Sequence, residues 1–258
     1  MRLDVAAELS GQIFPFMMIF CRIGTGMMMF PGVGEAFVPQ RVRMLFALVL
    51  SFLLLPILAP LMPAVPDHPG DLVRLMFIEI LVGVFFSSIM RLMMGIVEIA
   101  GTVIGMDIGL SNASILNPSL ASESALPSAF LGSTALVLVF VTGMDHLLLQ
   151  ALMDTYKIFP VAEPLPYGDL VQTFIHLVSQ AFQIGVQLAS PLIVMGLLLY
   201  TSIGIMQRLM SQVQLFLVVI PVQIWGGLFV FSASVAIIFT FWLQYFDDVV
   251  GKLFIRAG

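Results

Sequence analysis

Residues 75–127 read LMFIEILVGVFFSSIMRLMMGIVEIAGTVIGMDIGLSNASILNPSLASESALP. The part that ends at Gly109 is apolar over a length that exceeds one membrane span, which needs about 20 residues. The part that follows is rich in Ser, Asn and Pro, and Glu123 is its one charged residue. A long apolar helix that leads into a polar loop of small residues is typical of part of a pore.

A ladder of glycines runs along the end of the apolar part. Gly101, Gly105 and Gly109 are spaced four residues apart, which places them on one face of a helix. Small residues at this spacing let a second backbone approach closely, which is how helices associate where water does not drive them together. The ladder therefore predicts close helix packing at these three glycines.

The same stretch carries four charged side chains, Glu79, Arg91, Glu98 and Asp107. Charges in apolar surroundings are costly and are expected to face protein or a path for water. Arg91 and Glu98 are seven residues apart and share a helix face, so we expect them to join helices or subunits through ion pairs. A proton or ion relay is the alternative that the sequence leaves open.

A second polar stripe follows further along the chain. Gln183 and Gln187, together with Gln180, recur at helical spacing beside a small-residue ladder of Ala181, Gly185 and Ala189. Amide side chains in apolar surroundings hydrogen-bond between helices. Gln183 and Gln187 are therefore predicted to make polar contacts between helices or between subunits.

The composition indicates an integral membrane protein built from helices. The chain of 258 residues is 60% hydrophobic and 10% charged, with a mean hydropathy of +1.10, whereas soluble domains average about 45–50% apolar and about 25% charged residues. The apolar runs are continuous rather than alternating, which favours helices over a β-barrel. A net charge of −5 without a cluster of basic residues argues against a nucleic-acid partner.

Six apolar stretches are predicted to form the helices. The third, fifth and sixth exceed one span, and the third alone would extend ~58 Å, beyond a ~40–45 Å bilayer with its headgroups. These stretches are therefore either broken, with Pro191 and Pro221 as the expected break points, or project out of the bilayer. The first run is followed by no cleavage site, so we expect it to be retained as a helix. The stretches are residues 13–30, 44–62, 72–110, 128–151, 170–206 and 213–246.

Two further expectations concern domain organisation and orientation. No repeat and no linker divides the chain, so a single domain is expected over residues 1–258. With six simple spans, basic residues fall on both sides of the membrane, and the positive-inside rule gives no orientation.

Enzymatic signatures are weak. Asp107 and Asp145 are the candidates for an intramembrane aspartyl protease pair, but neither stands in a nucleophile motif. His68, His146 and His176 lack a second ligand at zinc-site spacing, and the chain has no phosphate-binding P-loop. We therefore expect no enzymatic activity, no cofactor and no metal.

Four segments together carry a family resemblance. FCRIGTGMMMFPGVGEAFVPQRVRMLFALVL, GLSNASILNPS, TGMDHLLLQALMDTYKIFP and LASPLIVMGLLLYTSIGIMQRLMSQVQLFLVVIPVQI resemble, in this order, segments of the flagellar biosynthetic protein FliR family, the R-type subunits of flagellar and type III secretion export gates. Two departures stand out: Ser211 takes the place of a proline in the family's turn after Arg208, and Thr142–His146 extends an asparagine-glycine-histidine motif.

The resemblance implies a fold, partners and a location. It implies a P-type subunit, about residues 1–205, joined to the end of a Q-type hairpin, about residues 206–258, in a helical multi-subunit gate. The implied partners are P- and Q-type gate subunits, the larger export apparatus with its B- and A-type membrane components, and unfolded export substrates. The implied location is the bacterial inner membrane at the flagellar basal body, with much of the complex raised toward the periplasm, which fits overlong helices.

The resemblance also assigns the polar loop, about Gly105–Glu123, to the plug of the secretion pore. The plug residues implied are Ser111, Asn112, Ser114, Asn117 and Pro118. The alternative from another class is a stand-alone transporter of ions or small solutes. It would require paired broken helices in two related halves, and the sequence shows no such symmetry.

Overall fold

The structure is a computed structural model that describes residues 2–109, 126–209 and 215–255. Within these ranges the regular structure is helical and no strand occurs. The prediction of an all-α, membrane-type protein is confirmed.

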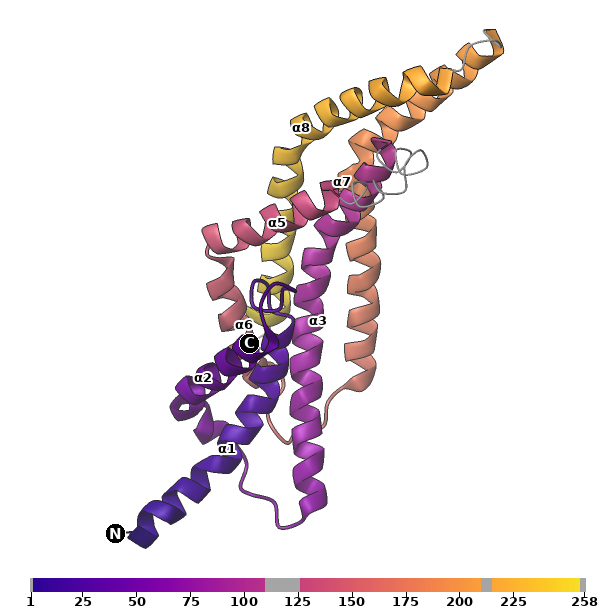
Figure 1. Cartoon of the computed structure of the whole chain (residues 1–258). Helices are drawn as coiled ribbons and strands as arrows, with labels where there is room; N and C mark the ends of the chain where they lie inside the picture. Colours follow the sequence, from indigo (N-terminus) through magenta and orange to yellow (C-terminus); the bar gives the residue numbers. More distant parts are fainter. Residues whose placement is uncertain (1, 110–125, 210–214, 256–258) are drawn as a thin grey trace. The chain divides into compact units, whose positions relative to one another are not determined.

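The described residues of the six predicted apolar stretches are largely helical (Figure 1). The fourth stretch forms two helices that are separated at Gly143, whose φ of +73° suits a residue without a side chain. The elements are α1 (Arg2–Met28), α2 (Gln40–Leu58), the 3-10 helix η1 (Ala59–Leu61), α3 (Pro69–Asp107), α5 (Leu126–Val141), α6 (Met144–Ile158), α7 (Tyr167–Leu209), α8 (Leu215–Val250) and the π-helix η3 (Gly251–Ile255).

The expected break points at Pro191 and Pro221 are wrong. Both prolines lie inside uninterrupted helices, α7 with 43 residues and α8 with 36, which curve rather than break (Figure 1). A proline removes one helical hydrogen bond, but a helix in apolar surroundings tolerates it when neighbouring groups satisfy the freed carbonyl. The long stretches are therefore single helices.

Four of the described helices are long and apolar enough to cross a membrane. A fifth span results if α5 and α6 together form one. The four segments are Gln40–Leu61, Pro69–Asp107, Tyr167–Gln207 and Val219–Leu253.

The chain forms two compact units that are interleaved along the sequence. Unit 1 comprises Met1–Arg91, Val139–Ile175 and Asp248–Gly258, and unit 2 comprises Leu92–Leu138 and His176–Asp247. Helices α3, α5, α7 and α8 contribute to both units. The expected division near residue 205, between a P-like part and a Q-like hairpin, stays a prediction.

In unit 1, α1 packs against α2, α3 and α6. Met18, Ile23 and Met27 of α1 are fully buried. A methyl group on Gly83 of α3 would collide with the hydroxyl of Thr25 and with the carbonyl of Arg22, so α1 and α3 touch through their backbones. Small residues permit this approach, as at other helix interfaces in membranes.

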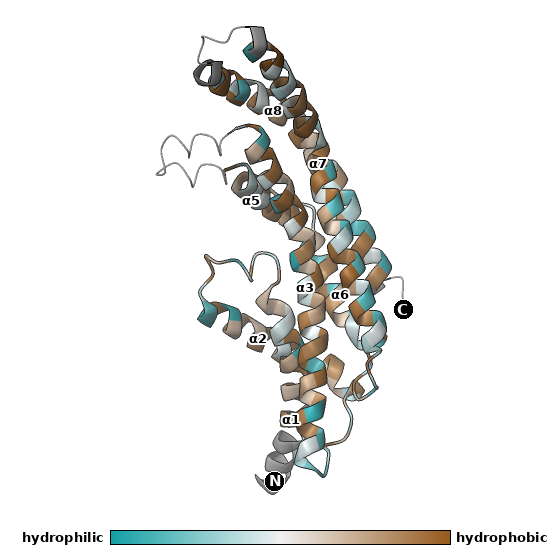
Figure 2. Ribbon diagram, turned by 90° about the vertical axis from the view of Figure 1, so that its right-hand side faces the viewer, coloured by the Kyte–Doolittle hydropathy of each residue, from teal (hydrophilic) through white to brown (hydrophobic). Residues whose placement is uncertain are grey.

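Unit 2 contains an antiparallel pair formed by α7 and α8, which run side by side in Figures 1 and 2. The Tyr245 hydroxyl donates to Gln180 Oε1 at 3.2 Å, whereas Tyr200, further along α7, contacts Gln223, earlier on α8. The fully buried Trp242 of α8 donates its indole N–H to the carbonyl of Met93 on α3 at 2.9 Å. This bond satisfies the polar atom that a buried indole carries and ties α8 to α3.

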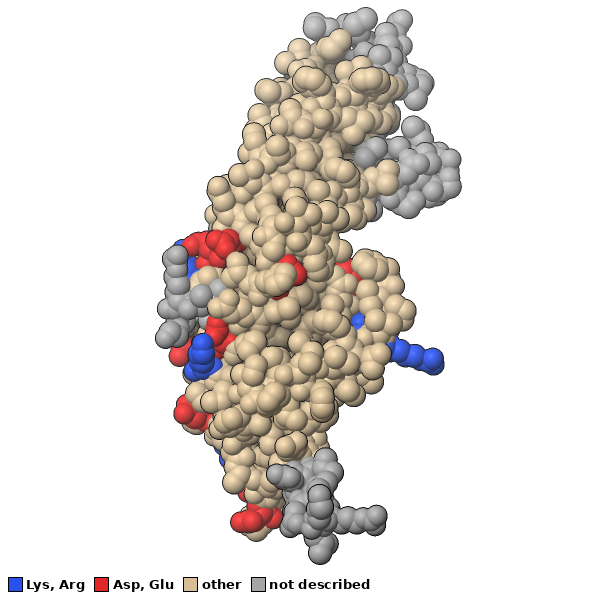
Figure 3. Space-filling model, turned by 90° about the vertical axis from the view of Figure 1, so that its left-hand side faces the viewer, with Lys and Arg blue, Asp and Glu red and all other residues tan. Residues whose placement is uncertain are grey.

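Charged residues are concentrated in unit 1. Of the Lys, Arg, Asp and Glu residues in the chain, unit 2 contains Glu98, Asp107, Glu123, Arg208 and Asp247. Apolar side chains are exposed on its α7 and α8, among them Leu197, Trp225 at 80% and Phe229 at 77%. Figure 2 shows the apolar character of these helices, and the face in Figure 3 has broad areas without charge. Exposed apolar area on this scale is typical of a surface that is covered by lipid or by partner subunits.

Candidate functional site

The five predicted plug residues, Ser111, Asn112, Ser114, Asn117 and Pro118, lie outside the described residues. The structure does describe the two flanks of the polar loop, where α3 ends and α5 begins. The Ser128 hydroxyl at the start of α5 donates to the Glu98 carbonyl on α3 at 2.9 Å. The polar loop therefore begins where α3 ends. Its other end is bound to α3 through the contact between Ser128 and Glu98.

The glycine ladder lies at these flanks. A methyl group on Gly101 would collide with the backbone of Pro127 and Ser128, so this glycine permits α5 to cross α3. Gly105 is buried. These placements support the assignment of the ladder to helix packing.

Gly109, the last of the ladder, lies past the end of α3. Its φ of +86° is one that side-chain-bearing residues rarely adopt, and its N–H donates to the Met106 carbonyl at 3.1 Å. A glycine at this position is a common way to end a helix. Gly109 therefore marks the point where the chain turns from α3 toward the loop.

The predicted polar residues Arg91 and Glu98 lie in different surroundings. Arg91 is 48% exposed in its side chain, and its Nη1 lies 3.6 Å from Glu35 Oε1, which links α3 to the segment that follows α1. Glu98 lies at the contact with α5, where its carbonyl accepts from Ser128 and its Cγ would lie 3.6 Å from a methyl group on Gly132.

Gln183 and Gln187 are exposed on α7, whereas the neighbouring small-residue ladder is buried. A methyl group on Gly185 would lie 2.8 Å from Ile99 Cγ2 and 3.1 Å from the carbonyl oxygen of Ile96, so the ladder packs on α3. The two glutamines are thus exposed on α7 and lie outside this contact.

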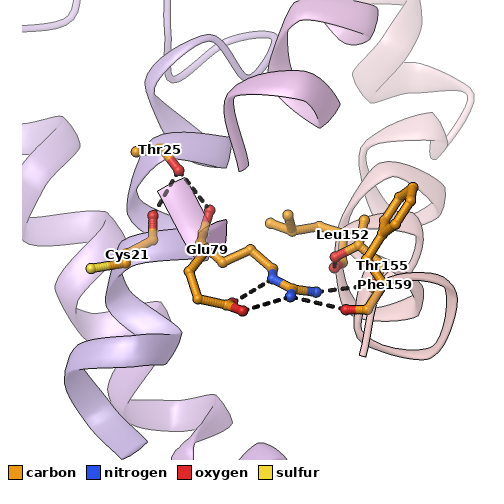
Figure 4. Close-up of polar contacts among 7 residues, drawn as sticks. Cys21, Thr25, Glu79, Leu152, Thr155 and Phe159 are labelled. Atoms are coloured by element: carbon orange, nitrogen blue, oxygen red, sulfur yellow. Dashed lines mark hydrogen bonds and ion pairs between the residues drawn. The ribbon is translucent and has the colours of Figure 1, made fainter. Parts of the chain in front are cut away.

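A buried ion pair in unit 1 is the polar site that the sequence analysis missed (Figure 4). Arg22 of α1 and Glu79 of α3 are both fully buried. Arg22 donates from Nε to Glu79 Oε2 at 2.6 Å and from a terminal nitrogen to Oε1 at 2.9 Å. The fork of the guanidinium matches both carboxylate oxygens, which is the strong, bidentate form of this contact.

The same guanidinium also binds the end of α6. It donates to the carbonyls of Thr155 and Phe159, each at 3.0 Å, and its Cζ lies 4.0 Å from the centre of the Tyr156 ring. The last carbonyls of a helix lack partners within the helix, so a cation placed there satisfies them. Arg22 therefore joins α1, α3 and the end of α6 at one point.

A sequence signal for this site exists. Arg22 and Glu79 each stand inside an apolar helix, and charges in that position are expected to pair with one another. The charges of its own helix are the expected partners of Glu79, whereas Arg22 is 57 positions away in the chain, so this pair could not be read from helical spacing.

In the part of the chain that the structure describes, no three His, Cys, Asp or Glu side chains are grouped so that they could hold a metal ion. The polar features that the structure does describe are two. In unit 1 a buried ion pair joins α1, α3 and the end of α6, and in unit 2 the two flanks of the polar loop contact α3.

Comparison with known proteins extends over nearly the whole chain. Residues 13–249 match the family model of bacterial export proteins, family 1. The chain is 32% identical over 239 residues to the flagellar biosynthetic protein FliR of Caulobacter vibrioides, which covers 93% of this chain and 95% of the relative.

More distant relatives carry the same description. The chain is 28% identical over 244 residues to the FliR protein of Escherichia coli, covering 93% of this chain and 90% of the relative. It is 26% identical over 240 residues to that of Bacillus subtilis, covering 88% and 89%. The chain therefore belongs to the bacterial export protein family that includes the flagellar biosynthetic protein FliR.

Proposed function

We propose that this chain is the R-type subunit of a flagellar protein export gate in the bacterial inner membrane. The observation that carries the proposal is the family match over residues 13–249 together with relatives named for flagellar biosynthesis. The helices that are long and apolar enough to cross a membrane support the membrane location. The role is structural and non-enzymatic: the subunit forms part of the secretion pore and its plug.

The surface of unit 2 supports assembly with other subunits. Its α7 and α8 expose large apolar side chains together with the amides of Gln183 and Gln187. In apolar surroundings, amide side chains and close packing bind helices to one another. The partners proposed are P- and Q-type gate subunits, which together with the A- and B-type membrane components pass unfolded export substrates.

The flanks of the polar loop support the plug assignment. The chain turns away from α3 at Gly109 and contacts the same helix again at Ser128, so the Ser- and Asn-rich segment between these residues begins and ends at α3. Small uncharged residues obstruct a channel without selecting passing chains by the sign of their charge.

Co-purification tests the assembly. An affinity-tagged chain expressed with the P- and Q-type subunits of its own organism should be recovered with both from detergent-solubilised membranes. A chain that is recovered alone and transports ions by itself would favour the alternative, a stand-alone transporter.

A further inference from the structure

The C-terminal end of α3 is held between α7 and α8 of unit 2. A methyl group on Gly227 of α8 would lie 2.7 Å from Ile108 Cγ1 and 3.1 Å from Ile108 Cα. A methyl group on Gly196 of α7 would lie 3.4 Å from Asp107 Oδ1. The two glycines thus let both helices close on the last residues of α3.

Gln223 of α8 provides a cap for this helix end. Its side chain is 2% exposed, and its Nε2 donates to the backbone carbonyl of Asp107 at 2.8 Å and to the hydroxyl of Tyr200 on α7 at 2.9 Å. The carbonyl of Asp107 is one of the last four in α3 and has no partner within the helix. In a buried, apolar place such a carbonyl is expensive to leave unpaired, and the amide of Gln223 satisfies it.

Both amide protons of Gln223 are therefore used, one on α3 and one on α7. The turn at Gly109 also rests on the same side chain, because a methyl group on Gly109 would lie 2.9–3.1 Å from the amide atoms of Gln223. A single side chain thus fixes the helix end, the turn that follows it and the neighbouring helix.

We propose that Gln223 is a positioning residue that keeps the end of α3 fixed on the α7–α8 pair as the anchor of the polar loop. This inference rests on the proposed plug function. The proposal requires that Asp107 and Ile108 stay in place on α7 and α8 during export. Gln223 acts through α3 and touches no export substrate.

The first test removes the two donated hydrogen bonds. Gln223→Met keeps the length of the side chain but has no donor, so the end of α3 loosens and the assembled gate becomes leaky to ions. The measurement is ion conductance of membranes that contain the complete gate, with recovery of all partner subunits checked in parallel. Gln244→Met is the matched control, since Gln244 is an exposed glutamine on the same helix. An assembled Gln223→Met gate that is as tight as the control overturns the proposal.

The second test locks the anchor and does not depend on the first variant folding. Asp107→Cys and Gly196→Cys are combined in a Cys21→Ser background, which removes the chain's one native cysteine. A methyl group on Gly196 would lie 3.8 Å from Asp107 Cβ, within the ~3.5–4.5 Å between β-carbons in disulfides, and the backbone carbonyl of Asp107 remains for Gln223. With the disulfide formed, we expect the amount of secreted flagellar protein in the medium to stay within twofold of the single-cysteine variants. Secretion that is lost on oxidation and returns on reduction shows that the end of α3 must move, and overturns the proposal.

A third variant separates this inference from the plug function itself. Replacement of Asn112–Ser122 by a short glycine linker removes the loop but leaves Gln223 and its partners. If this variant leaks ions but the Gln223→Met gate stays tight, the anchor inference is contradicted and the plug function is not. If neither variant leaks although both assemble, the plug function fails and the anchor inference fails with it.

Discussion

Replacing Arg22 by methionine should destabilise unit 1 severely. The substitution keeps an apolar stem but removes the bidentate contact with Glu79 and the two donations to Thr155 and Phe159 at the end of α6. Glu79 is fully buried and would be left without its counter-charge. Breaking one partner of a buried pair typically costs about 3–5 kcal/mol, a large part of the stability of an ordinary protein.

The surface pair supplies the control. Arg91 is half-exposed and lies 3.6 Å from Glu35, a contact of the kind that contributes under about 1 kcal/mol. The assay is thermal unfolding of the detergent-purified gate complex, monitored by loss of this subunit, for Arg22→Met and Arg91→Met side by side. We expect Arg22→Met to melt at a clearly lower temperature or to be recovered in much lower yield.

A double variant tests the reason for the loss. If the harm comes from the uncompensated carboxylate, Arg22→Met combined with Glu79→Leu should recover part of the stability that Arg22→Met loses, because apolar replacement of a complete buried pair is often tolerated. Equal melting of the Arg22→Met and Arg91→Met complexes, or a double variant no more stable than Arg22→Met, would refute the reasoning.

Further predictions concern helix contacts in unit 2. Gly101→Leu should prevent assembly, because the leucine side chain would collide with the backbone of Ser128. Gly95 on the same helix has open space around it, so Gly95→Ala should raise stability by about 0.5–1 kcal/mol. Equal yields of the two variant complexes would contradict this. Trp242→Phe removes the donation to the Met93 carbonyl and should lower stability by about 1–3 kcal/mol in thermal unfolding; an unchanged melting temperature would contradict this.

Most of the fold followed from the sequence because long apolar runs leave few alternatives to helices. The length of three apolar stretches showed that they exceed one membrane span. The prediction that two of them break at Pro191 and Pro221 was wrong, because one lost hydrogen bond does not end a helix that neighbouring groups support. The turn at Gly143 was not foreseen, although the polar residues Thr142, Asp145 and His146 beside it interrupt the apolar run.

The polar contacts were less accessible to sequence reasoning. Arg22 with Glu79 and Gln223 with Asp107 pair residues that are 57 and 116 positions apart, so their partners depend on how the helices pack. Helical spacing relates residues on one helix, which is why Arg91 and Glu98 were singled out together. The small-residue pattern was more informative, because Gly101 and Gly185 both lie where a side chain would collide with a neighbouring helix.

The most direct test of the export-gate account is the ion conductance of inner membranes that contain the complete gate with Asn112–Ser122 replaced by a short glycine linker. The account predicts that this variant co-purifies with its partner subunits at wild-type yield and leaks ions and small solutes, because the obstruction is gone while its flanks at Gly109 and Ser128 remain fixed. A complex that assembles fully and stays as tight as wild type would contradict the plug, and the polar segment would then be a connection between α3 and α5.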